Sequence, residues 1–142
     1  MCKFNHIVPL QVRYNDVDQQ GHINNAVTME YFDLGKSLYF ESVGISVTPD
    51  SDFTVLIVHY DVDFVGQMHF HDRMEVCTRL ERLGNKSVTL CQEVRVDGTP
   101  CVVCHTVLSG YSRSSRKSAP IPDDVKARIL AYENAPSDES SH

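Results

Sequence analysis

The sequence predicts an α+β domain in which an antiparallel five-stranded sheet wraps around one long helix. Apolar residues with helical spacing run from about Asn25 to Gly44 and indicate the helix. One extended segment before it and four after it alternate apolar with polar residues, as half-buried strands do. A length of 142 residues with 42% hydrophobic composition suffices for one core and leaves little for a second.

A strand, a polar loop and the long helix come first. Residues 8–14 alternate apolar with polar groups and predict a strand, whereas residues 15–22 break any periodicity and predict a loop. The apolar stripe of the helix consists of Val27, Tyr31, Leu34 and Leu38, widened by Phe32, Tyr39 and Val43. Asn24 or Asn25 suits the start of the helix, and Gly44 suits its end. Because the apolar residues extend well round the helix, we expect it in the core.

Four strands and a short helix complete the domain. The strands are expected at residues 53–66, 73–82, 85–96 and 101–111. Residues 83–86, Leu-Gly-Asn-Lys, form a short turn that makes the middle pair a hairpin. Residues 123–132 follow two prolines and have helical spacing, whereas residues 134–142 are too polar to pack and are expected to be disordered. We therefore predict a single domain over residues 1–133.

Charge and cysteine content exclude several classes of protein. The net charge of −6 disfavours nucleic acid or an anionic membrane as a partner. No apolar stretch approaches the roughly 20 residues needed to cross a bilayer, and no signal-peptide pattern opens the chain. Five cysteines without a secreted framework indicate reduced thiols. We expect a cytoplasmic protein.

The polar loop before the helix is the candidate site. A helix N-terminus presents backbone N–H groups without intrahelical acceptors, and these can stabilise an oxyanion as it forms. Asp18 supplies a carboxylate nearby, and Gly21 lets a ligand approach the backbone closely. The alternative is that Asp16, Asp18 and the asparagines only form turns and caps. The residues by themselves leave both interpretations open.

A family resemblance bears on this choice. The segment 13–25, Arg-Tyr-Asn-Asp-Val-Asp-Gln-Gln-Gly-His-Ile-Asn-Asn, followed by Tyr31-Phe32-Asp33, resembles the signature of hotdog-fold acyl-CoA thioesterases related to 4-hydroxybenzoyl-CoA thioesterase. Weaker likeness at residues 60–64, 71–72 and 83–87 extends it over roughly residues 7–113. The resemblance implies a hotdog fold that joins two sheets edge to edge, with active sites between subunits and no cofactor. A homodimer or homotetramer is expected.

The resemblance also implies roles for residues. Asp18 matches the catalytic carboxylate, acting as nucleophile or as general base, and the backbone N–H at Asn25 matches the group that polarises the thioester carbonyl. His22 either positions water or substrate or has a structural role, and Tyr31 is expected to line the substrate pocket. The implied reaction converts acyl-CoA to free acid and coenzyme A. Gly66 and His71 depart from residues common in the family, which bears on acyl-chain specificity.

Positive residues in this otherwise acidic protein are candidates for holding coenzyme A phosphates. They are Arg82, Lys86 and the basic cluster Arg113, Arg116 and Lys117, with Ser87 as a neutral donor. The alternative for the basic cluster is a solvated loop after the last strand.

Other groups have plainer explanations. His59, Asp61 and Asp63 share a strand face and could ligate a metal, but such residues are common on exposed faces, and we expect no metal. Cys101 and Cys104 lie in a strand, where residues three apart point to opposite faces, so a redox or zinc site is not expected there. Two other functions stay open: a non-enzymatic acyl-CoA binding or sensing module, and a hotdog dehydratase or hydratase.

Overall fold

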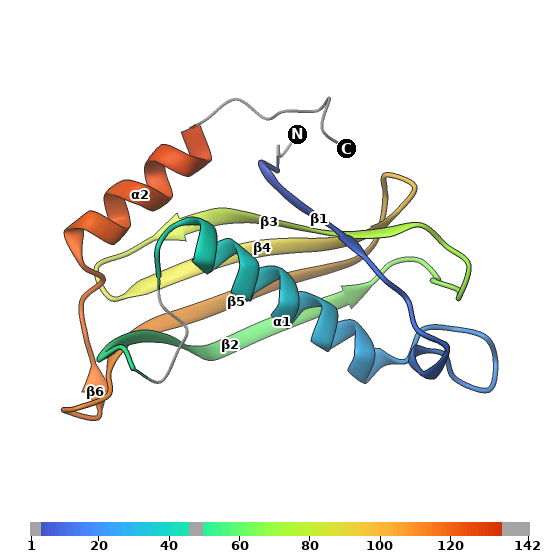
Figure 1. Ribbon diagram of the computed structural model, residues 1–142, viewed down its shortest axis with the longest axis horizontal. Coiled ribbons are helices and arrows are strands. Elements are labelled where there is room, and N and C mark those ends of the chain that lie inside the picture. The colour runs from blue at the N-terminus through green and yellow to red at the C-terminus, as the bar shows by residue number, and fades with distance from the viewer. Residues whose placement is uncertain (1–3, 46–49, 135–142) are drawn as a thin grey trace.

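The computed structural model describes residues 4–45 and 50–134 and confirms the predicted α+β architecture. The elements are β1 His6–Leu10, the 3-10 turn η1 Tyr14–Asp16, α1 Asn25–Ser42, β2 Phe53–Phe64, β3 Met74–Leu83, β4 Ser87–Val96, β5 Thr99–Ser112, β6 Lys117–Ser118 and α2 Asp123–Asn134. Helix α1 lies across one face of the sheet, and α2 lies beside β3, where it packs against the C-terminal half of α1 (Figure 1). The tail predicted at 134–142 lies outside the described residues, except for Asn134.

The sheet is antiparallel throughout and has the order β1-β3-β4-β5-β2, with β6 paired to β5. The two-residue β6 was missed because so short a segment has no readable alternation. The first strand ends earlier than the predicted 8–14, because residues 14–16 turn into η1. The predicted hairpin is confirmed, with the N–H of Gly84 donating to the carbonyl of Ser87 at 2.8 Å. Among the described residues, β1 and the twelve-residue β2 form the edges.

Helix α1 begins and ends as predicted, but its buried face differs from the predicted apolar stripe. Asn24 caps it through a 2.8 Å hydrogen bond from the N–H of Ala26, and Gly44 follows its end at φ +82°. The buried residues are Thr28, Tyr31, Phe32, Gly35, Lys36, Tyr39 and Phe40. Leu34 is 46% exposed, so its place in the predicted stripe was wrong. Gly35 takes the position against the sheet, since its lack of a side chain allows close approach.

The close packing of Gly35 against the sheet leads to a testable prediction. A Cβ atom at this position would lie 2.8 Å from Cγ2 of Val76 and 2.9 Å from Nε2 of Gln92. Both side chains are fully buried, and Nε2 of Gln92 already donates to the carbonyl of Phe32 at 3.0 Å. Gly35→Ala should therefore lower the free energy of unfolding by about 1–3 kcal/mol, although alanine is the better helix former. Urea denaturation measures this. Ser37→Ala on the exposed side is the control, and equal stability of Gly35→Ala and wild type would contradict the close contact.

Two further predictions from the sequence concern the cysteines and membrane-spanning segments. Cys77, Cys91, Cys101 and Cys104 are thiols, as predicted, and burial raises the pKa of Cys77 to about 12. Among the described residues, neither helix has the length and apolar character needed to traverse a bilayer.

Candidate active site

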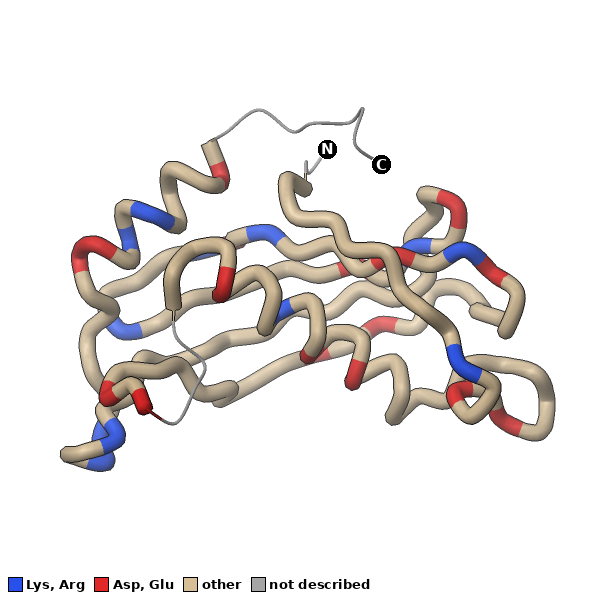
Figure 2. The backbone as a smooth tube through the Cα atoms, viewed as in Figure 1, with Lys and Arg blue, Asp and Glu red and all other residues tan. Residues whose placement is uncertain are grey.

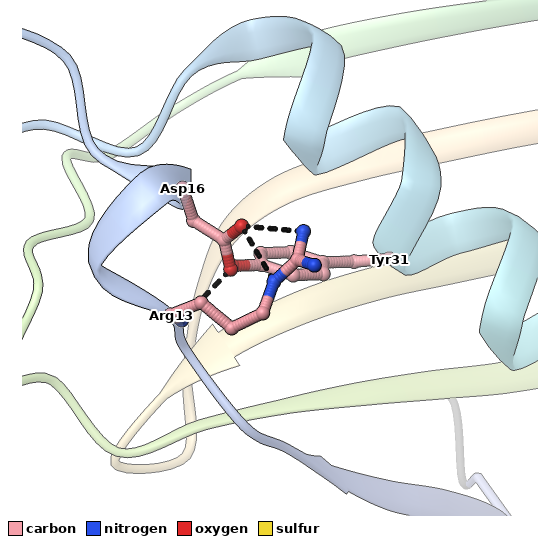
Figure 3. A network of polar contacts seen from close by, with 3 residues as sticks. All are labelled: Arg13, Asp16 and Tyr31. Atoms are coloured by element: carbon pink, nitrogen blue, oxygen red, sulfur yellow. Dashed lines mark hydrogen bonds and ion pairs between the residues drawn. The ribbon is translucent and has the colours of Figure 1, made fainter.

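The two loop carboxylates occupy different environments, and Asp16 is the buried one. Its side chain is 1% exposed and accepts hydrogen bonds from both the backbone and the guanidinium of Arg13, at 2.9 to 3.1 Å (Figure 3). The hydroxyl of Tyr31 on α1 donates to the same carboxylate at 2.8 Å. Burial opposes ionisation, but these hydrogen bonds and the charge of Arg13 outweigh it and lower the pKa of Asp16. Asp16 therefore ties the loop to α1.

Tyr31 is the residue of α1 that bonds to the loop carboxylate of Asp16. It is 7% exposed, and burial together with the neighbouring Asp16 carboxylate raises the pKa of its phenol. The hydroxyl of Tyr31 contacts the loop, so its expected role in substrate binding stays a prediction. In the structure, this hydrogen bond holds the loop against α1.

We expect Asp16→Asn to destabilise the fold. An amide offers one acceptor oxygen where the carboxylate uses two, and its NH2 group would face donors of Arg13 and Tyr31, so the loss is about 2–3 kcal/mol at neutral pH. The folded pKa of Asp16 lies below its unfolded value of about 3.9, so this stabilisation is present above about pH 4 and is lost as pH falls through the folded pKa. Urea denaturation at pH 7 and in acid should show the mutant and wild type converging in acid. Equal stability at pH 7 would contradict this role.

Asp18 is exposed and is oriented by the backbone. Its Oδ1 accepts the N–H groups of Gln20 and His22, at 2.9 and 3.1 Å. The chain closes a turn here, with the N–H of Gly21 donating to the carbonyl of Asp18 at 3.1 Å and Gly21 at φ +81°. Among the described residues, no group donates to Oδ2 of Asp18. One carboxylate oxygen is thus fixed, and the other is open to a ligand.

Asp18 lines a cavity of about 540 Å³. The other lining residues are Tyr14, Val17, Gln19, Gly21, Phe70 and His71. The rings of Tyr14 and Phe70 meet edge to face at 6.2 Å, and Tyr14 is 83% exposed. The carboxylate therefore stands beside an aromatic rim that sequence reasoning did not identify, because Tyr14 and Phe70 lie far apart in the chain.

His22 and Asn25 line a second cavity, of about 300 Å³. Consecutive residues of the loop line the two cavities, Gly21 the first and His22 the second. The structure thus brings Asn25 and His22 into one cavity and places Asp18 in its neighbour. The ring of His22 lies edge to face against that of His69, with 5.0 Å between centroids.

The N-terminus of α1 retains an open donor at Asn25. Asn24 satisfies two of the next three backbone N–H groups, since its Oδ1 accepts the N–H of Ala26 and its carbonyl accepts that of Thr28. No described residue accepts the backbone N–H of Asn25, which is the first residue of the helix. This N–H can therefore donate to an oxygen placed in the second cavity.

Arg82, Lys86 and Ser87 lie at the other end of the sheet. They belong to the β3–β4 hairpin, beside the start of α2 (Figure 1), and positive residues gather at that end (Figure 2). Helix α1 has 18 residues, so its length of about 27 Å separates this end from Asn25. Within one chain these residues and Asp18 do not form one site, and phosphate binding stays a prediction.

Comparisons with known proteins find a matching family model, a similar bacterial protein and similar solved structures. A model of the thioesterase-like superfamily matches residues 12–129. Protein YsmA of Bacillus subtilis (strain 168), itself uncharacterized, is 23% identical over 128 residues, which cover 89% of this chain and 86% of YsmA. A thioesterase from Thermus thermophilus, solved with coenzyme A and zinc, is 28% identical with a TM-score of 0.82, over 96% of this chain and 99% of that one. A predicted thioesterase from Bacillus stearothermophilus is 28% identical with a TM-score of 0.79, over 92% and 97%.

The family match spans the parts of the molecule that form the candidate site. It includes the loop with Asp18, helix α1 and the four long strands β2 to β5. The similar solved structures extend over nearly the whole chain and share its overall fold. The chain therefore belongs to the thioesterase-like superfamily and has the hotdog fold that the resemblance implied.

Proposed function

We propose that this protein hydrolyses acyl-CoA thioesters to a free acid and coenzyme A. The observation that carries the proposal is the pairing of two open groups on adjoining cavities: Oδ2 of Asp18 and the backbone N–H of Asn25. Acyl transfer requires a nucleophile or base, which a carboxylate can supply, and a hydrogen-bond donor to the oxyanion. The 28% identical Thermus thermophilus thioesterase, solved with coenzyme A, supports coenzyme A as the carrier.

The mechanism begins with the thioester carbonyl in reach of the helix N-terminus. The N–H of Asn25 donates to the carbonyl oxygen and stabilises the negative charge that develops there. Asp18 then attacks the carbonyl carbon and expels the thiolate, leaving a mixed anhydride for water to hydrolyse. Alternatively, Asp18 removes a proton from a water molecule that attacks directly. A thioester has little resonance stabilisation and a good leaving group, so these two groups suffice.

A substrate panel tests the proposal. Purified protein is mixed with aliphatic and aromatic acyl-CoA esters, and released coenzyme A is followed with a thiol-reactive dye. We expect release with at least one class, well above the rate of Asp18→Asn. Binding of acyl-CoA without release across the whole panel would reject hydrolysis and favour the binding or sensing module.

We also propose that two chains pair through β2. This edge strand is twelve residues long and carries exposed apolar side chains, namely Leu56, Ile57, Val58, Tyr60 and Phe64. A long apolar edge is prone to pair with another strand, and pairing with a second copy would protect it. Phe64 also lines the cavity of Asn25, so the partner would stand beside the site.

The same pairing would bring the basic cluster of one subunit toward the candidate site of the other. In an antiparallel pair of β2 strands, the Phe64 end of one lies beside the Phe53 end of the other. Arg113 is held at the Phe53 end, where its backbone N–H and its Nε donate to Asp52 and Ser51 at 2.8 Å. We infer that the basic cluster of the partner subunit approaches the cavity of Asn25. Coenzyme A phosphates could then be held across the interface.

Light scattering should give a dimer of about 32 kDa, or a tetramer of about 64 kDa, rather than the 16.0 kDa of one chain. Val58→Lys places a charge on the edge strand at a side chain that is 61% exposed, and it should shift the population toward monomer. Leu130→Lys, on the exposed side of α2, is the matched control and should leave the mass unchanged. A monomeric wild type at micromolar concentration would contradict the interface.

A further inference from the structure

Three metal-ligating side chains meet on the face of the sheet that lies away from α1. The side chain of Gln92 reaches α1 through the carbonyl of Phe32, so its neighbour Cys91 points to the opposite face. His105 on β5 is the direct cross-strand partner of Cys91 on β4, and Glu81 projects from β3 on the other side. Three adjacent strands thus contribute one residue each.

Their donor atoms are close together. The carboxylate of Glu81, Sγ of Cys91 and a ring nitrogen of His105 all lie within 4.8 Å of one another. Nδ1 of His105 is 3.1 Å from the carboxylate. Ligand atoms around a tetrahedral zinc ion lie about 3.3–3.7 Å apart, given bonds of about 2.0–2.3 Å. Glu81 is exposed and His105 is half-buried, so small side-chain rotations suffice to close the remaining gap.

We propose that Glu81, Cys91 and His105 bind a zinc ion. Thiolate, imidazole and carboxylate together form a donor set that zinc accepts, with water in the fourth position. Binding releases the proton of the Cys91 thiol to solvent, so one thiolate and one carboxylate balance the two positive charges of the ion. Without metal, Nδ1 of His105 contacts the carboxylate of Glu81 at 3.1 Å, and zinc would replace that contact with bonds to both side chains.

The position of this site in the sheet favours a stabilising role over a part in the proposed reaction. Cys91 is 4% exposed and packs in an apolar cluster with Phe4 and Cys77, so the zinc–sulfur bond would be shielded from water on that side. Asp61 is the cross-strand partner of His105 on β2 and is the next carboxylate along the same row. The site joins β3, β4 and β5 without contributing to either cavity near Asp18. Zinc would therefore strengthen the sheet and leave the reaction chemistry to the loop.

The test uses full-length, untagged protein that has been treated with a chelator and kept reduced. Cobalt(II) serves as a spectroscopic probe, because thiolate coordination produces a charge-transfer band in the near ultraviolet and tetrahedral geometry produces visible bands. We expect one cobalt ion per chain, displaced by zinc, and a rise in Tm on adding zinc. Cys91→Ser should abolish the charge-transfer band, and His105→Gln should weaken zinc affinity by roughly 100-fold.

Matched controls separate this site from other thiols and histidines. Cys77→Ser changes a buried neighbouring cysteine outside the group, and His59→Gln changes an exposed histidine, so both should bind zinc like wild type. Absence of binding at micromolar zinc, or binding unaffected by both Cys91→Ser and His105→Gln, would overturn the proposal. The readouts are spectroscopic and thermal, so they stand whether or not the protein hydrolyses acyl-CoA.

Discussion

Asp18→Asn should reduce the turnover number by about 10²–10⁴-fold while keeping the fold. Asparagine retains an oxygen for the hydrogen bonds from Gln20 and His22, so the turn is preserved. It replaces the other oxygen with an amide nitrogen, which can neither attack a thioester nor remove a proton from water. Steady-state kinetics on the best acyl-CoA substrate measure the effect.

The neighbouring carboxylate supplies the contrast for this experiment. Asp16→Asn removes a buried acceptor of Arg13 and Tyr31, so it should lower stability more than Asp18→Asn and reduce the turnover of folded protein much less. If Asp18 were only a turn residue, Asp18→Asn would cost about 1 kcal/mol or less and leave turnover near wild type. A fully active Asp18→Asn enzyme would overturn its assignment as nucleophile or base.

Asn25→Pro should lower the turnover number by about 10²–10³-fold. Proline at the first helical position lacks only the backbone N–H that we assign to the thioester carbonyl, and its fixed φ suits the start of a helix. The preceding Asn24 has φ −63° and ψ 139°, a conformation that tolerates a following proline. The cap on Ala26 is unaffected, so the melting temperature should change little.

Asn25→Ala is the control, because it removes the exposed side chain and retains the N–H. It should keep most of the activity, and the contrast between the two variants isolates a single backbone group. Equal loss in both would assign the effect to the side chain. Full activity in Asn25→Pro would place carbonyl polarisation elsewhere.

Much of the fold could be predicted because its signals are local. Alternation along each strand and helical spacing after Asn25 depend on neighbours a few residues apart, as do the cap at Asn24 and the hairpin at residues 83–86. The position of the candidate loop followed from the same patterns. The predicted apolar stripe of α1 was wrong at Leu34, which is exposed. The face that packs on the sheet is set instead by the close approach of Gly35 to Val76 and Gln92.

By itself, the sequence determined the α+β class, the helix that begins at Asn25 and the polar loop that precedes it, since each follows from local periodicity and capping. Only the tertiary structure decided which aspartate is buried, because Asp16 meets Tyr31 through the packing of the loop on α1. It also decided that Asp18 and Asn25 line adjoining cavities rather than one. The grouping of Glu81, Cys91 and His105 depends on strand register, and residues that meet through register carry no common pattern along the chain.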